Sequence, residues 1–301
     1  MTLVECVPNF SEGRRPEVID EIAAAMAAVD GVHVLDRQSD PTHNRCVITL
    51  VGPDEAAARA AFGGIAAAAR LIDLTKHQGA HPRFGATDVV PFVPLKDDDM
   101  PVCVKLARAL AARVAAELDI PAYLYEDAAL RPGHRNLADV RRGEFEGLRE
   151  AILTDEARAP DEGPRRLHPT AGAVAVGARP PLIAYNVDLE TTDLDLAREI
   201  AVAIREKDGG FPKVKAMGLA LDDCVQVSMN LVDYRVTSMH TVFAEIARRA
   251  EARGVGVRRS EVVGLLPEAA LVDVARRALA AHEFGQQQVL EARVLDLVTR
   301  A

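Results

Sequence analysis

The sequence predicts an α+β protein made of two ferredoxin-like (split β-α-β) α/β sandwich subdomains, with a ligand cleft between them. Three observations lead to this prediction. The chain has 301 residues, more than a single hydrophobic core commonly holds, so two domains are expected. Apolar residues make up 49% of the chain and there is no tryptophan, which favours alanine-rich helices layered on sheet. The order strand–helix–strand–strand–helix–strand occurs clearly in the first half and approximately in the second.

In the first half, short apolar runs that end at Pro or Gly predict strands, and alanine-rich periodic runs predict helices. Pro16 stands at a first helical position, where its missing N–H is not needed, and Asp54 is the expected N-cap of the second helix. Pro91 and Pro94 predict that their strand lies at a sheet edge or ends there. We expect strands at 3–7, 32–36, 44–51, 87–93 and 122–125, and helices at 16–29, 54–72 and 101–118.

The second half follows a stretch that is rich in Pro and Gly. Residues 159–172 (APDEGPRRLHPTAG) show no periodicity and predict a loop or linker. Asp193 is the expected cap of the helix that follows two further strands. We expect strands at 173–176, 182–189, 214–220, 224–232 and 257–265, and helices at 194–207, 238–253, 267–281 and 284–300. The predicted subdomains are residues 1–178 and 179–301.

The chain is acidic, since 36 Lys and Arg residues against 45 Asp and Glu residues give a formal net charge of −9. An acidic surface repels nucleic acid and anionic membranes, so neither is an expected partner. No apolar run approaches the roughly 20 residues of a membrane helix, and no signal peptide is visible. The 4 Cys residues lie scattered in apolar runs, which predicts buried reduced thiols and a cytoplasmic protein.

The stretch KHQGAHPRFGATDVVPF, residues 76–92, raises the question of function. His77 and His81 have the i, i+4 spacing of two metal ligands on a helix. Gly79 lies between them, a Pro follows, and Gln replaces the Glu of the zinc motif, so we expect a non-helical segment and no metal. Two interpretations stay open. The stretch is an ordinary surface loop, or its donors bind a small anion, its histidines exchange protons, and Gly79 and Gly85 let the backbone approach a ligand.

Two further loops leave expected strands with similar polar content. They are DRQSDPTHNRC at 36–46 and VPNFSEGR at 7–14. Taken singly, their Asp, Asn and Ser residues serve equally well as turn and helix-capping residues. Three polar loops at the strand ends of one sheet suggest a shared site, but residue types alone do not identify a reaction.

Four motifs together resemble the glutamate formimidoyltransferase family: VECVPNFSEG near the N-terminus, HNR at 43–45, KHxGxHPRxGAxDVVPF at 76–92 and VQVSMNLVDY at 225–234. The resemblance implies an enzyme of histidine degradation. It would transfer the formimino group of N-formimino-L-glutamate to N5 of tetrahydrofolate and release L-glutamate. The resemblance also implies tetrahydrofolate as co-substrate, no metal, two α/β subdomains with folate between them, and a homodimer.

Roles for individual residues follow from the same resemblance. The second His of KHxGxHPR is the family's catalytic base, which is His81 here. The cationic amidine of the donor calls for an acid, and Asp40 is the nearest candidate in the 36–46 loop. The sequence departs from the family there, because Gln38 stands where the animal enzymes are expected to have an acid. The expected substrate-binding residues are Asp40, His43, Asn44, Arg45, Lys76, His77 and Arg83. The expected folate-binding segment consists of Gly163, Pro164, Arg165, Arg166, Leu167, His168, Pro169, Thr170, Ala171 and Gly172.

Two alternatives stay open on the sequence. The first is a formyltransferase of the same fold that uses N-formylglutamate and tetrahydrofolate. The second is a folate-binding protein without catalysis, which the presence of His81 within its full motif argues against, because a carrier does not need a base. Turnover with each donor separates these alternatives.

Overall fold

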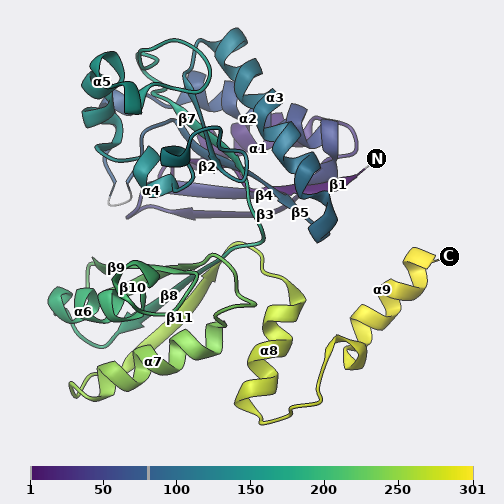
Figure 1. Ribbon diagram of the computed structural model, residues 1–301, viewed down its shortest axis with the longest axis vertical. Helices are drawn as coiled ribbons and strands as arrows, with labels where there is room; N and C mark the ends of the chain where they lie inside the picture. The colour runs from purple at the N-terminus through teal and green to yellow at the C-terminus, as the bar shows by residue number, and fades with distance from the viewer. Residues whose placement is uncertain (1, 80–81, 301) are drawn as a thin grey trace. The chain divides into compact units, whose positions relative to one another are not determined.

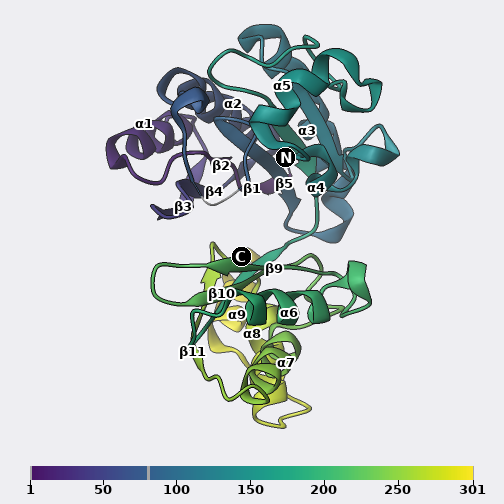
Figure 2. The same ribbon diagram turned by 90° about the vertical axis from the view of Figure 1, so that its left-hand side faces the viewer.

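The computed structural model describes residues 2–79 and 82–300. The chain forms two compact units, residues 1–180 and 181–301, and each contains one sheet with helices packed on it (Figures 1 and 2). The protein is therefore a mixed α/β protein with two sheets, as the alternation of patterns predicts. His81, the predicted base, lies outside the described residues.

The first sheet has mostly antiparallel strands at one side and parallel strands at the other. Strand β4 pairs with β3 on one side and with β1 and β2 on the other, and β1 and β2 also pair with β5. Strands β5, β7 and β6 run parallel in that order. The strands are β1 (Leu3–Cys6), β2 (Asn9–Phe10), β3 (His33–Asp40), β4 (Arg45–Pro53), β5 (Thr87–Pro94), β6 (Ala122–Glu126) and β7 (Val174–Ala178).

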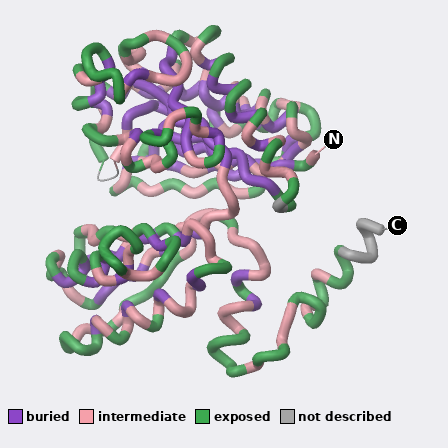
Figure 3. Tube along the Cα trace, viewed as in Figure 1, coloured by how far each residue is buried: buried purple, intermediate pink, exposed green. Residues whose placement is uncertain are grey.

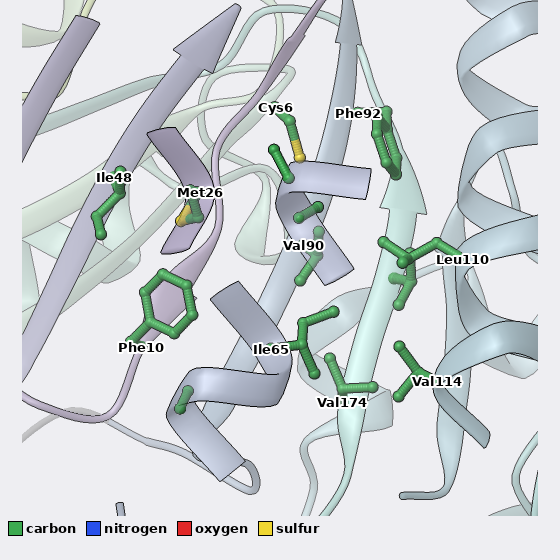
Figure 4. Close-up of a cluster of buried hydrophobic side chains, with 14 of the residues drawn as sticks. Cys6, Phe10, Met26, Ile48, Ile65, Val90, Phe92, Leu110, Val114 and Val174 are labelled. Atoms are coloured by element: carbon green, nitrogen blue, oxygen red, sulfur yellow. The ribbon is translucent and has the colours of Figure 1, made fainter. Parts of the chain in front are cut away.

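Helices cover the first sheet unequally on its two faces. One face packs on α1 (Pro16–Ala27), α2 (Asp54–Leu71) and α3 (Met100–Leu118), and Figure 4 shows the apolar cluster there, with Phe10, Ile48 and Val90. On the other face, a smaller cluster joins β5, β6 and β7 to α4 (Leu137–Val140) and α5 (Glu144–Thr154). The parallel strands are thus buried on both faces, as parallel strands usually are (Figure 3).

Of the two alternatives predicted from Pro91 and Pro94, the strand end is confirmed, since β5 ends at Pro94. The edge position is wrong, because β5 lies between β1/β2 and β7. The carbonyl of Pro91 accepts a hydrogen bond from the amide of Val7 at 3.1 Å. In a strand, the N–H and C=O of one residue point to the same side. The missing N–H of Pro91 therefore faces the interruption between β1 and β2, around Pro8, where no ladder bond is broken.

The second unit has a four-stranded sheet in the order β11-β8-β10-β9. Residues of β8 and β10 with odd numbers, such as Val187 and Val227, pack with α6 and α7 in a separate core. The side chains of Asp193 and Ser238 cap these two helices, and the predicted hairpin of β9 and β10 is confirmed. The elements are β8 (Ile183–Leu189), α6 (Leu194–Ile204), β9 (Val214–Ala220), β10 (Val225–Leu231), α7 (Met239–Glu251), β11 (Val257–Val263), α8 (Glu268–Ala278) and α9 (Leu290–Arg300).

Several local expectations change. Asp54 is the first residue of α2 rather than its cap, because Pro53 occupies the cap position. Helices α4 and α5 were not expected, and α9 begins at Leu290 instead of residue 284. The four cysteines are free and buried, as predicted. Short 3-10 helices occur at Leu74–Lys76, Asp97–Asp99, Pro132–His134, Glu156–Arg158, Glu206–Asp208 and Gln286–Gln288.

Candidate active site

The three polar loops of the first unit meet at one end of its sheet. Because β4 and β5 run antiparallel to β2, and β4 also to β3, their first residues lie where β2 and β3 end. The register places Arg45 opposite Asp40, and Phe10 opposite both Cys46 and Thr87. The sequence pattern of polar loops at strand ends therefore corresponds to one cluster of side chains.

Two glycines allow these loops to pack closely. A Cβ on Gly13 would lie 2.2 Å from the carbonyl oxygen of Asp40, and a Cβ on Gly79 would lie 2.3 Å from that of His43. A Cβ on Gly85 would lie 1.8 Å from the carbonyl oxygen of Ala173. At both Gly79 and Gly85, protein backbone therefore occupies the space that a side chain would need.

The turn between β3 and β4 joins Asp40 to His43. One carboxylate oxygen of Asp40 accepts hydrogen bonds from the amides of Thr42 and His43, and the other lies 2.8 Å from Nδ1 of His43. Partial burial raises the pKa of Asp40, but these hydrogen bonds outweigh burial and hold the pKa below its usual value. Asp40 is therefore ionised at neutral pH, and it orients the ring of His43.

His77 is fixed through both ring nitrogens. Its Nδ1 accepts a hydrogen bond from Nε of Arg83 at 3.2 Å, and its Nε2 lies 3.0 Å from the carbonyl oxygen of Asn44, to which it donates. Burial lowers the pKa of His77, and the charge of Arg83 lowers it further. The ring is thus held neutral, with its one proton on Nε2.

Asn44 and Arg83 extend this arrangement. The side chain of Asn44 accepts from the amide of Gly13 at 2.9 Å and donates to the carbonyl of Gln78 at 2.9 Å, so that it ties together all three loops. Arg83 forms ion pairs with Glu144 and Glu146 at the start of α5. Its hydrogen bonds to Glu146 are the main cause of the raised pKa of Arg83.

A second group of charges surrounds Asp88, whose side chain is only 2% exposed. One carboxylate oxygen accepts from the amide of Phe84 at 3.1 Å, and the other accepts from both Arg45 and Arg141. Arg45 also donates to the side chain of Asn9. Burial and the neighbouring Arg141 lower the pKa of Arg45 to about 10, so Arg45 keeps its charge at neutral pH.

These groups line one small pocket, formed by Ser11, His43, Asn44, Arg45, His77, Arg83 and Asp88. Five of the seven expected substrate-binding residues are therefore brought together: His43, Asn44, Arg45, His77 and Arg83. Asp40 contacts the pocket through His43, while Lys76 is 82% exposed and pairs with Asp73 at the surface. Among residues 2–79 and 82–300, no group of three or more His, Cys, Asp or Glu side chains is placed to hold a metal ion.

The expected folate-binding segment runs along the first unit, and only its end reaches the pocket loops. The carbonyls of Thr170 and Ala171 accept hydrogen bonds from the amides of Leu74 and Ala86. The ring of His168 accepts from the amides of Thr170 and Ala171, and burial lowers its pKa.

The two arginines of that segment are engaged elsewhere. Arg165 pairs with Glu156, and Arg166 pairs with Asp119. Gly163 and Gly172 have φ of +90° and +71°, a conformation that favours glycine. Backbone conformation therefore accounts for both glycines of the segment.

The sequence did not indicate the contribution of α4 and α5. Arg141 follows α4, and Glu144 and Glu146 begin α5. These residues lie more than fifty positions from the loops they contact, and no motif or spacing connects them to those loops. Asp88 lies within the 76–92 motif, but its partners could be found only in the structure.

Two known protein families match this chain, one in each half. The family "Formiminotransferase domain, N-terminal subdomain" matches residues 3–179, and the family "Formiminotransferase domain" matches residues 184–297. The chain belongs to the formiminotransferase domain family. The two family matches meet near the division between the two compact units, at 180 and 181.

Relatives of this family align with nearly the whole chain. A protein named "Glutamate formimidoyltransferase" from Streptococcus pyogenes serotype M1 is 49% identical over 97% of this chain and 99% of its own. A second of that name, from Thermoplasma acidophilum, is 49% identical over 98% of both chains. The "Formimidoyltransferase-cyclodeaminase" of Sus scrofa is 44% identical over 91% of this chain and 52% of its own.

Among residues 2–79 and 82–300, the structure contains no helix with the length and apolar character that a membrane crossing requires.

Proposed function

We propose that this protein is a glutamate formimidoyltransferase, which transfers the formimino group of N-formimino-L-glutamate to N5 of tetrahydrofolate and releases L-glutamate in histidine degradation. The observation that carries the proposal is the 49% identity, over 97% of this chain and 99% of the relative, with a protein of that name. The pocket supports it, since its cationic side chains, Arg45 and Arg83, are suited to a dicarboxylate.

The chemistry requires two proton movements. N5 of tetrahydrofolate attacks the carbon of the protonated amidine, and the new C–N bond leaves N5 positively charged in a tetrahedral adduct. A neutral imidazole removes that proton, which typically accelerates a reaction about 10²- to 10⁴-fold. The imidazolium then protonates the glutamate nitrogen as its C–N bond breaks, which restores the amidine on folate and frees glutamate.

We assign both proton transfers to His81, as the KHxGxHPR motif implies. His77 is unsuited to this role, because Arg83 donates to its Nδ1 and its Nε2–H is bound to the carbonyl of Asn44. His77 instead connects the 76–83 loop to the turn before β4. A general base needs an accessible lone pair, which His77 lacks.

Asp40 is proposed to stabilise the cationic amidine. Its low pKa keeps it negatively charged at neutral pH. A formyl group is neutral, so such an acid favours the formimino donor alone. This difference makes Asp40 the residue that separates formimino transfer from the alternative of formyl transfer.

Folate is proposed to lie between subdomains 1–178 and 179–301, each built on a ferredoxin-like sheet, with residues 163–172 contributing to its binding. The strand order β11-β8-β10-β9 with α6 and α7 supports that topology in the second unit. A homodimer in the cytoplasm is proposed from the same family resemblance. Sedimentation measures the oligomer, and comparison of the intact chain with one ending at residue 178 measures the need for both subdomains in folate binding.

The function is tested by mixing the protein with tetrahydrofolate and either donor, and identifying the product. We expect 5-formiminotetrahydrofolate and L-glutamate in equal amounts from formiminoglutamate. We also expect a lower kcat/KM with formylglutamate. Faster turnover of formylglutamate would establish the formyltransferase instead. Tight folate binding without either product would establish a non-catalytic folate-binding protein.

A further inference from the structure

Arg141 is the feature of the pocket region that the proposed mechanism leaves without a role. It follows the short helix α4, and its side chain is 15% exposed. One guanidinium nitrogen contacts the Asp88 carboxylate. Its Nε–H is buried and has no hydrogen-bond partner among the described residues. A buried N–H without a partner costs about 1–3 kcal/mol, and more on a charged group, so its presence needs an explanation.

The charges around Asp88 also show that Arg141 shares its carboxylate partner with Arg45. Arg45 and Arg141 place two positive charges on one carboxylate, and a single oxygen of that carboxylate serves both. The other oxygen is occupied by the amide of Phe84. Structural ion pairs in protein interiors usually have matched charges and satisfied donors. In the trio of Arg45, Asp88 and Arg141, two guanidinium groups therefore share one carboxylate oxygen, and Nε–H of Arg141 is left without a partner within the described part of the chain.

Asp88 also fixes the position of this donor. The side chains of Asp88 and Arg141 are 2% and 15% exposed, so their ion pair is largely shielded from bulk water. Asp88 and Arg45 both line the pocket with His43 and His77. Arg141 is thus one hydrogen bond away from the pocket-lining residues, at the side formed by β5. A guanidinium in this position is suited to a carboxylate, to which arginine binds in a fixed, often two-pronged geometry.

We propose that Arg141 binds a carboxylate of the glutamate moiety of the formimino donor, with Asp88 orienting it and Arg45 adding charge. This inference rests on the proposed function and names a specificity-determining residue for it. Binding of the donor supplies the acceptor that Nε–H lacks and neutralises the excess charge. A donor in which that carboxylate is replaced by an amide is then a poor substrate.

The test is a thermodynamic cycle between the protein and the donor. Donor binding is measured by calorimetry for wild type and Arg141→Gln, with N-formimino-L-glutamate and with its γ-amide and α-amide analogues. We expect neutralising one carboxylate to weaken binding to wild type about 10- to 100-fold. The same change should weaken binding to Arg141→Gln less than about threefold, because the partner is already absent. Equal penalties in both proteins, for both amides, would overturn the inference.

A matched control separates this role from a structural one. Arg142 is the next residue, is 76% exposed and pairs with Asp139, so Arg142→Gln should leave the whole cycle unchanged. Arg141→Lys keeps a positive charge beside Asp88 but lacks the two-pronged guanidinium group. It should therefore fold even if Arg141→Gln does not. We expect it to show an intermediate penalty. The inference would also be overturned if Arg141→Lys bound the donor with normal affinity and lost as much binding as wild type when one donor carboxylate is replaced by an amide.

The folate tail carries the same chemistry as the donor, because it ends in glutamate. Repeating the kinetics with tetrahydropteroate, which lacks that glutamate, distinguishes the two sources. We expect Arg141→Gln to raise the donor KM equally with both acceptors. Loss of the effect with tetrahydropteroate would assign Arg141 to folate and contradict the inference. Absence of transfer by wild type would instead refute the proposed function, while calorimetry with L-glutamate would still test Arg141.

Discussion

Each sheet of the protein contains one buried aspartate with polar partners, and the two environments differ in charge. Asp88 in the first unit holds two arginines, each 15% exposed. Asp188 in the second unit accepts from the amide of Gln226 at 2.8 Å and pairs with Arg259, which is 65% exposed. The first group has two positive charges for one negative charge, whereas the second group is balanced.

The polar atoms without a partner differ as well. In the first group this atom is a donor, Nε of Arg141, and in the second it is an acceptor, Oε1 of Gln226. Only the first group offers a cation and a donor to an anionic substrate, next to two pocket histidines. Burial of an acid therefore does not by itself distinguish the two groups, whereas the number of arginines and the unpaired donor do.

The largest expected effect tests whether the chemistry belongs to the first unit. His81→Ala should lower turnover at least about 100-fold, with folate affinity nearly unchanged, because proton transfer acts in the transition state. His77→Ala should be milder, since its two ring nitrogens serve packing of the loops. Steady-state kinetics and folate titration measure both. Near-normal turnover of His81→Ala would place the base elsewhere.

The next effect compares the two aspartates directly. Asp88→Asn leaves two buried guanidinium groups without a counter-charge and should lower the free energy of unfolding by about 3–5 kcal/mol. Asp188→Asn should cost below about 1 kcal/mol, because exposed Arg259 regains water and the new amide still accepts from Gln226. Urea unfolding of both variants measures the difference. Equal costs would remove the distinction between the two groups.

A smaller effect concerns recognition of the donor. If Asp40 stabilises the amidine as proposed, Asp40→Asn should cost roughly 1.5–3 kcal/mol with the formimino donor and little with the formyl donor. Steady-state kinetics with both donors, for wild type and Asp40→Asn, give the ratio of kcat/KM between the formimino and the formyl donor. The same loss with both donors would mean that Asp40 only shapes the turn through Thr42 and His43.

The smallest effect is on the dependence of stability on pH. Burial holds the folded-state pKa of His77 below its ordinary value, so the unfolded chain binds this proton more readily. Its contribution to stability is then complete above the unfolded pKa of about 6.5 and is lost as the pH falls below it. His77→Gln should flatten the curve below pH 6.5, by at most about 1.4 kcal/mol per pH unit. If the free energies of unfolding of wild type and His77→Gln differ by a constant amount from pH 5 to 8, His77 is not held neutral in the folded protein.

The sequence predicted much of the fold because its signals are local. Periodicity, Pro and Gly located most helices and strands, and polar residues at strand ends located the loops that meet at the pocket. Pro91 led to the wrong edge prediction because its missing N–H lies opposite the break between β1 and β2 at Pro8, where no hydrogen bond is lost. That break belongs to the neighbouring strands and cannot be read from the residues around Pro91. Arg141 was not found for a similar reason: it reaches Asp88 across 53 residues of sequence, and no local pattern records that contact.

The most direct test replaces one arginine partner of each buried aspartate. Arg141→Gln and Arg259→Gln remove the same cation from Asp88 and Asp188, and kcat/KM is measured with N-formimino-L-glutamate at saturating tetrahydrofolate. We expect Arg141→Gln to lose about 10- to 100-fold and Arg259→Gln to change less than about twofold, because its ion pair is exposed. Equal losses in the two variants, or a larger loss in Arg259→Gln, would contradict the assignment of donor binding to the end of the first sheet.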